Sequence, residues 1–121
     1  MIKTARDIVG TDRAIVLNTD GHHLTKNVAT GRCTSCWWTI SRKSLQSCTW
    51  VLIFRLREGA YEADVLIGRP DGIDETIEDE EGVRKVKIAF IQEDAETTDS
   101  TWSTFCGIKK DVTNPVRYIN G

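Results

Sequence analysis

The clearest pattern of apolar and polar positions lies in residues 48–57, where every second side chain is apolar. These side chains are Trp50, Leu52, Phe54 and Leu56. Successive residues of a strand point to opposite faces, and the first half of the other face is apolar as well, which predicts a central strand. A turn at residues 58–59 leads into residues 60–67, which also alternate, so the two segments together predict an antiparallel hairpin.

The N-terminal part of the chain predicts a short helix followed by a pair of strands. Thr4 and Asp7 have the spacing of a helix-capping pair, and Gly10 is a suitable helix stop. The β-branched run at residues 14–17 predicts a buried strand. The Asp-Gly turn that follows predicts a hairpin, in which residues 22–26 return beside that strand.

Less regular segments complete the predicted order of elements. Further strands are predicted at residues 37–41, 83–91 and 116–119, and a short helix capped by Asp99 is predicted before Gly107. Polar residues, Gly or Pro dominate the rest, which predicts loops or turns at residues 27–36, 42–47, 68–72, 74–82 and 93–99.

These elements predict an α+β domain of mostly antiparallel β structure that spans residues 1–121. Consecutive hairpins favour an antiparallel sheet, and a sheet of more than about five strands usually curls over its core or closes. We therefore expect a strongly curved sheet or a small barrel, with short helices near the N- and C-terminal ends. A length of 121 residues and a hydrophobic content of 40% suit a single core.

Neither a membrane span nor a signal peptide is predicted. The longest fully apolar run is residues 50–54, whereas a membrane helix needs about 20 apolar residues. The first ten residues carry charges and lack an apolar core. We therefore expect a cytoplasmic protein without membrane partners, whose four cysteines are free thiols. Two disulfides, with three possible pairings, are the alternative.

Charge is distributed unevenly along the chain, although the net charge is only −2. Residues 1–57 hold nine basic and three acidic side chains, whereas residues 71–99 hold eleven acidic and three basic ones. We expect the two segments to pair and neutralise each other on one surface. If the fold kept them apart, they would form separate patches, which matters for charged partners.

Adjacent Trp37 and Trp38 are the most informative functional signal. In a strand they must point to opposite faces, so only one can enter the core of a sheet with a single buried face. Exposed aromatic rings are favoured at interfaces and in ligand pockets. We therefore predict a non-catalytic binding or accessory protein that uses a sheet face for a small ligand or a partner protein, and that forms a homodimer. The predicted binding residues are Arg32, Trp37, Trp38, Arg42 and Lys43.

Two other functions stay open. The basic, tryptophan-containing N-terminal half could bind single-stranded nucleic acid by stacking and charge, but the net negative charge disfavours this. Cys33 and Cys36 have metal-ligand spacing, and with His22 or His23 they could form a zinc site or a small active site. The second close pair of a zinc finger is missing and no catalytic motif is present, so no catalytic residue, metal ligand or cofactor is assigned.

Overall fold

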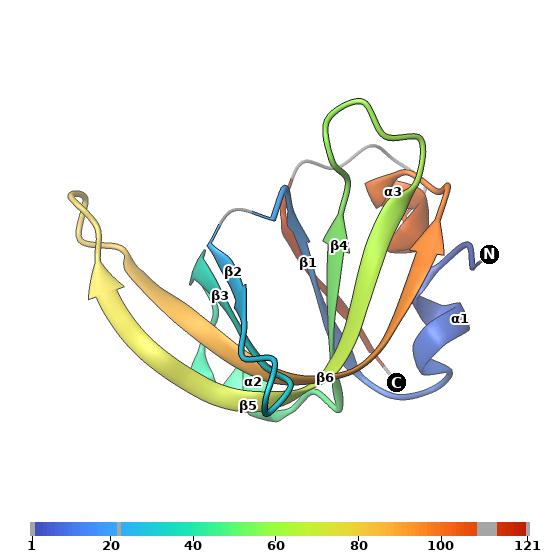
Figure 1. Cartoon of the computed structure of the whole chain (residues 1–121). Coiled ribbons are helices and arrows are strands. Elements are labelled where there is room, and N and C mark those ends of the chain that lie inside the picture. The colour runs from blue at the N-terminus through green and yellow to red at the C-terminus, as the bar shows by residue number, and fades with distance from the viewer. Residues whose placement is uncertain (1, 22, 109–113, 121) are drawn as a thin grey trace.

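The computed structural model describes residues 2–21, 23–108 and 114–120, which form one mixed sheet with three short helices (Figure 1). The seven strands are arranged in the order β2-β3-β6-β5-β4-β1-β7. The strands are β1 (Ala14–Thr19), β2 (Leu24–Lys26), β3 (Arg32–Trp38), β4 (Trp50–Arg55), β5 (Ala63–Glu78), β6 (Arg84–Thr98) and β7 (Val116–Ile119), and the helices are α1 (Ala5–Val9), α2 (Arg42–Gln46) and α3 (Trp102–Phe105). Of the pairs between these seven described strands, only β1 with β4 is parallel, so the predicted, mostly antiparallel β structure with short helices is confirmed.

β5 and β6 form one long, bent hairpin. The pairing between them shifts register after Ile67, between Pro70 and Ile73, and again before Glu75. Such bulges bend a strand and increase its twist, and Figure 1 shows the hairpin curving beneath the other strands and rising again at its yellow tip. The sheet ends at β2 on one side and at β7 on the other. It does not close, and the alternative prediction of a barrel is therefore not confirmed.

Apolar side chains are buried on both faces of the central strands. On the first face, here called the helix face, Phe54 of β4 packs with Trp102 and Phe105 of α3, at ring-centroid distances of 5.5 and 5.2 Å. On the other face, here called the inner face, Ile53 of β4 belongs to the same cluster as Phe90 of the bent hairpin. The sheet therefore curves toward the inner face, and its central strands are buried on both sides.

Local sequence determines the ends of the helices. Thr4 caps α1 in a reciprocal capping box with Asp7, and Gly10 ends the helix, as predicted. The cap of α3 is Thr101, whose hydroxyl oxygen accepts a hydrogen bond from the backbone N–H of Thr104, so the prediction of Asp99 as the cap is wrong. None of the helices in the described ranges has the length and apolar character needed to cross a membrane.

The predicted hairpin between residues 14–17 and residues 22–26 is wrong. β1 pairs with β4 in parallel and with β7 in antiparallel fashion, whereas β2 pairs with β3. Residues 14–17 are completely buried, so they need a covered strand on each side, and a three-residue strand with exposed Thr25 and Lys26 cannot provide that cover. Residue 22 lies outside the described residues.

Several predicted loops are regular structure. Residues 32–36 belong to β3, residues 42–46 form α2 behind the cap Ser41, and residues 68–78 and 93–98 extend β5 and β6. Apart from the buried Ser35 and Thr98, the polar side chains in these segments are partly or fully exposed, which is why their composition resembles that of loops. Pro70, expected in a turn, lies within β5 beside a bulge, a position that tolerates the missing N–H.

Candidate binding site

Trp38, at the C-terminal end of β3, lies in the inner-face core. Its side chain is 8% exposed, and its indole Nε1–H donates a hydrogen bond to the hydroxyl of the buried Ser35, with an N···O distance of 3.0 Å. The pairing of β3 with β6 is irregular between Ser35 and Trp38, and Trp38 then lies opposite Val86. The hydrogen bond and the apolar surroundings fix the position of this ring.

Trp37 is placed differently from its neighbour. It is half-buried and lies outside both core clusters. The ammonium nitrogen of Lys87, on β6, is 5.6 Å from the centroid of the Trp37 ring, within the range of a cation–π contact. One ring of the pair is therefore in the core and the other is partly accessible.

Both rings line a cavity of about 430 Å³, here called the aromatic cavity. Its other walls come from Thr39 after β3, from Lys85 of β6, and from the segment that leads into and forms part of β7, namely Asn114, Pro115, Val116 and Tyr118. Tyr118 contributes a third aromatic ring. The volume lies within the range of small-molecule sites, and aromatic walls with a few polar groups are typical of them.

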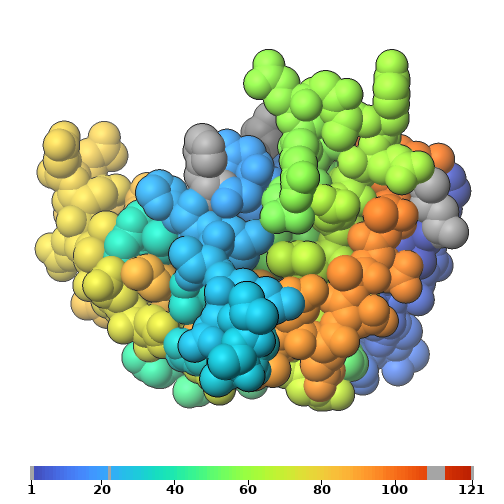
Figure 2. Space-filling view, in the orientation of Figure 1, coloured from blue at the N-terminus to red at the C-terminus, as the bar shows by residue number. Residues whose placement is uncertain are grey.

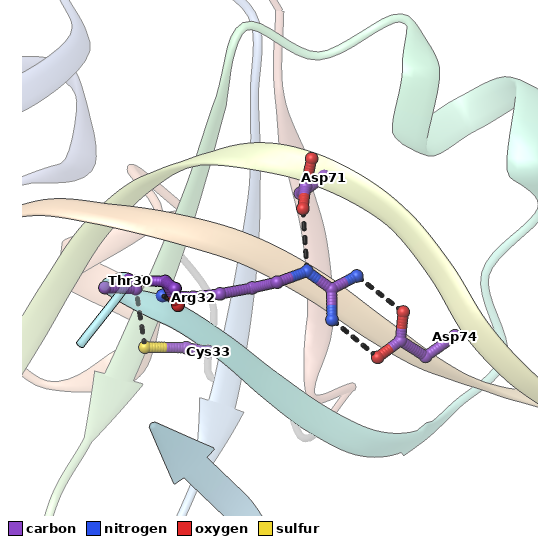
Figure 3. Close-up of polar contacts among 6 residues, drawn as sticks. Thr30, Arg32, Cys33, Asp71 and Asp74 are labelled. Carbon is purple, nitrogen blue, oxygen red and sulfur yellow. Dashed lines mark hydrogen bonds and ion pairs between the residues drawn. The ribbon is translucent and has the colours of Figure 1, made fainter. Parts of the chain in front are cut away.

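Arg32 is not part of this cavity. Its guanidinium group donates hydrogen bonds from Nε to Asp71, at 2.7 Å, and from two nitrogens to Asp74, at 2.8 and 2.5 Å (Figure 3). These hydrogen bonds raise the pKa of Arg32 and, through the same contacts, lower the pKa of Asp74. The guanidinium group of Arg32 is therefore occupied by carboxylates of its own chain.

The other two basic residues of the predicted site also lie elsewhere. Arg42 and Lys43 are exposed on α2, and Arg42 borders two hollows that α2 and the segment before it form with the bent hairpin. The structure thus brings Trp37 and Trp38 together at one cavity and places Arg32, Arg42 and Lys43 outside it.

The cysteines and histidines of the alternative site do not form a metal centre in the described part of the chain. Cys33 is buried, and burial raises the pKa of its thiol, which disfavours the thiolate that metal binding needs. All four cysteines are free, and no group of three Cys, His, Asp or Glu residues able to hold a metal is found among the described residues. His23 is exposed at the turn before β2, and His22 lies outside the described residues.

The second wall of the aromatic cavity was not predicted from the sequence. Residues 116–119 were expected to form an edge strand, and they do so as β7. Alternation of Val116 and Tyr118 with Arg117 was the available signal that two side chains of this strand share a face. Nothing in the sequence indicates that this face meets Trp37, because the two segments are brought together only by the curvature of the sheet.

Three ion pairs among the described residues join the basic segment 1–57 to the acidic segment 71–99, as expected, and they are Lys3–Asp99, Arg32–Asp71 and Arg32–Asp74. The other described pairs do not join these two segments, because one partner lies in residues 58–70 or both lie within residues 71–99. They are Arg55–Asp64, Arg57–Asp64, Arg69–Glu93, Lys85–Asp79 and Lys87–Glu75. Much of the basic charge is thus partly neutralised within the sheet.

Comparison with known protein families, with curated proteins and with solved structures found no match.

Proposed function

We propose that this chain is a non-catalytic binding protein whose aromatic cavity receives a planar, anionic group of a small ligand or of a partner protein. The observation that carries the proposal is the placement of Trp37, Trp38 and Tyr118 around one cavity of about 430 Å³. Stacking and burial of a ring between such side chains give favourable contact area with little loss of side-chain freedom.

The charge of the cavity favours an anion. Lys85 lines it, and none of the described residues that line it is acidic. Lys87 lies over the Trp37 ring, so a carboxylate held beside that ring would approach two ammonium groups and compete with their long contacts to Asp79 and Glu75, at 3.8 and 3.6 Å. A planar group with one carboxylate therefore matches both the aromatic and the basic character of the walls.

Indole-3-acetate is a suitable first probe because it combines an aromatic ring with a carboxylate. For a compound of this size we expect a Kd of about 1 mM, from about 0.3 kcal/mol of binding free energy per non-hydrogen atom. In an NMR titration, the indole N–H signals of Trp37 and Trp38 should shift and saturate, whereas that of Trp102, buried on the helix face, should not. Shifts that grow linearly without saturating, or that affect all tryptophans equally, would refute the proposal.

Substitutions separate the cavity from the remainder of the fold. Trp37→Ala should abolish binding of indole-3-acetate and Trp37→Phe should retain part of it, because phenylalanine keeps an aromatic face. Trp50→Phe is the matched control, since Trp50 packs against Arg69 away from the cavity. Equal binding by the Trp37→Ala variant and the wild type would show that the cavity is not the site.

We also propose that binding takes place in the cytoplasm and that the chain acts as a homodimer, on the sequence grounds given above. Light scattering of the purified chain measures the second point. We do not propose nucleic-acid binding, because Arg32 and Arg55 of the basic segment are engaged with carboxylates of the same chain.

A further inference from the structure

β7 is an end strand with an open edge. It pairs with β1, and no strand in the described ranges pairs with its other side. The backbone N–H of Asn18 donates to the carbonyl of Pro115, and the register then places Arg117 and Ile119 in hydrogen-bonded pairs with β1. Val116 and Tyr118 therefore direct their backbone N–H and C=O groups away from β1, toward the open edge.

These outward groups are available for a further strand. The N–H of Val116 already donates to the side-chain oxygen of Asn114, at 3.0 Å. The carbonyl of Val116 and both backbone groups of Tyr118 have no strand partner among the described residues. An unpaired edge of this kind is a template for strand addition, in which main-chain hydrogen bonds supply affinity.

A cavity lies beside β7 on each face of the sheet. The aromatic cavity is bordered by Val116 and Tyr118. A second cavity of about 400 Å³, here called the helix-side cavity, is bordered by Ile119, Arg6 and Phe105, and also by Tyr118. Successive side chains of an added strand point to opposite faces, so they would enter the two cavities alternately, which is how strand addition gains specificity.

Three arginines that form no ion pair with a described carboxylate lie near this edge. Arg6 donates hydrogen bonds to the backbone carbonyls of Gly10, Asp12 and Asn120, and the Arg13 guanidinium lies 5.4 Å from the ring centroid of Tyr118. Neither these two arginines nor Arg117 forms an ion pair with any described residue. A chain that pairs many of its other basic residues thus leaves three together here, which favours an acidic partner.

We propose that an extended, acidic segment of a partner protein adds to β7 as an eighth strand and places alternate side chains in the aromatic and helix-side cavities. This inference rests on the proposed function, because the aromatic cavity is one of its two side-chain pockets. It names the ligand of that cavity as an acidic peptide in strand conformation.

The test uses the full chain and a synthetic peptide, acetyl-Glu-Val-Glu-Phe-Glu-Val-Glu-amide, with binding measured by titration calorimetry at low and high salt. We expect the peptide to bind more weakly as the salt concentration rises.

Two further peptides carry N-methyl groups, one on all the glutamates and the other on the valines and phenylalanine. Each peptide therefore lacks the N–H donors of one strand edge. At least one should bind about tenfold more weakly, since each lost hydrogen bond reduces affinity several-fold. Unchanged binding of both methylated peptides, or no binding of the parent, would overturn the inference.

Arg117→Gln supplies the test on the protein side, with Lys43→Gln on α2 as the matched control. The first variant should weaken peptide binding several-fold and the second should not. Equal peptide affinities of the two variants would contradict the role of the arginine charge. A dimer that forms through β7 and that the peptide cannot dissociate would assign the edge to a second copy of the chain, which would overturn the inference.

The two proposals fail in different ways. If indole-3-acetate binds at Trp37 and both methylated peptides bind as tightly as the parent, the cavity stands and strand addition is wrong. The other outcome is that the parent peptide binds and N-methylation weakens it, while Trp37→Ala changes the affinity for neither the peptide nor indole-3-acetate. In that case β7 is the binding edge and the aromatic cavity is not a binding site.

Discussion

Arg32 leaves β3 and reaches two carboxylates on β5, although β6 lies between these strands (Figure 3). Its backbone is paired with Ile91 of β6. Asp71 and Asp74 lie on either side of Ile73, where the pairing of β5 with β6 shifts. One planar guanidinium group thus connects three strands at the point where the hairpin bends. Its fixed set of N–H donors can bind one carboxylate with two hydrogen bonds and a second carboxylate at the same time, which an ammonium group cannot do.

Arg32→Lys should therefore lower the melting temperature by a few degrees, because lysine cannot donate to Asp71 and bidentately to Asp74 at once. Circular dichroism during heating measures this. Arg84→Lys is the matched control, since Arg84 is exposed on the same hairpin and forms no ion pair with a described residue. Equal melting temperatures for both variants and the wild type would show that the bend does not depend on the guanidinium group.

Gly68 is required by close approach of the backbone. A Cβ atom on Gly68 would lie 2.5 Å from the carbonyl oxygen of Ile91 and 2.7 Å from the Phe90 ring, and the backbone of a paired strand cannot move aside. We expect Gly68→Ala to reduce the free energy of unfolding by about 3 kcal/mol, as overpacking of a core does.

Urea denaturation of Gly68→Ala and Gly59→Ala provides the comparison. Gly59 has a φ of 78° but open space around it, so alanine there should cost about 1 kcal/mol from backbone strain alone. If Gly68→Ala reduces the free energy of unfolding no more than Gly59→Ala does, β5 and β6 can move apart locally without loss of stability.

At the scale of elements, the sequence identified those strands in which apolar side chains alternate with other residues. β4 and the first half of β5 were predicted because apolar residues alternate there. Across this hairpin, Arg55 Nη2 lies 3.2 Å from a carboxylate oxygen of Asp64, an ion pair that supports the antiparallel register. β3 was only partly predicted, because its buried residues include Cys33 and Ser35, which are small or polar and give no apolar pattern. Its strand conformation depends on pairing with β6, a segment distant in sequence.

The same limit applies to the candidate site. Trp37 and Trp38 could be selected from the sequence because two adjacent rings in a strand are not expected to enter the same core. For the same reason, the sequence did not predict that both rings would line one cavity. Tyr118 and Lys85 could not be joined to them, since that requires knowledge of how far the hairpin bends. Acidic residues of β5 such as Glu75 suggested a loop, whereas their charge is balanced by Lys87 on the neighbouring strand.

The tip of the hairpin extends beyond the core, and Figure 2 shows it projecting from the body of the molecule. Its turn is held by Asp79, whose carboxylate accepts hydrogen bonds from the backbone N–H groups of Glu81 and Val83, both at 2.9 Å. We expect Asp79→Ala to accelerate amide hydrogen exchange at the tip while changing the global free energy of unfolding by less than about 0.5 kcal/mol. Glu80→Ala is the control, and faster exchange in β1 and β4 as well would show that the tip is coupled to the core.

At the scale of the whole molecule, three aspartates should control stability in acid. Backbone hydrogen bonds at the start of α1 lower the pKa of Asp7, and contacts with Arg32 and Lys3 lower those of Asp74 and Asp99 respectively. A carboxyl whose pKa is lower in the folded state stabilises the fold above its unfolded pKa, near 4, and this contribution is lost as the pH falls below that value.

Melting temperature measured from about pH 6 to pH 2 should therefore fall steeply below about pH 4. Asp74→Asn should be less stable than the wild type near neutrality, but its melting temperature should fall less steeply in acid because one of the three titrating groups is gone. Asp94→Asn is the control, since no ion pair involves Asp94 among the described residues. Parallel acid profiles for the wild type and Asp74→Asn would contradict the role of the Arg32 contact.

For the buried thiols, stability should decrease as the pH rises, which is the opposite direction from the carboxyl groups. Burial raises the pKa of Cys106 to about 11, so the folded state favours the protonated thiol. This contribution is fully present below the unfolded pKa, about 8.5, and it is lost as the pH rises toward the folded value. Cys106→Ala should therefore lose stability near neutrality, from the small cavity it leaves, yet its stability should decline less steeply than that of the wild type between about pH 8.5 and pH 11.

Urea midpoints measured across this range test the expectation, with Cys36→Ala as a control at a half-buried position. Cys106 also lines the helix-side cavity, so an unchanged alkaline slope in Cys106→Ala would mean that water reaches the thiol through that cavity and that burial does not raise its pKa.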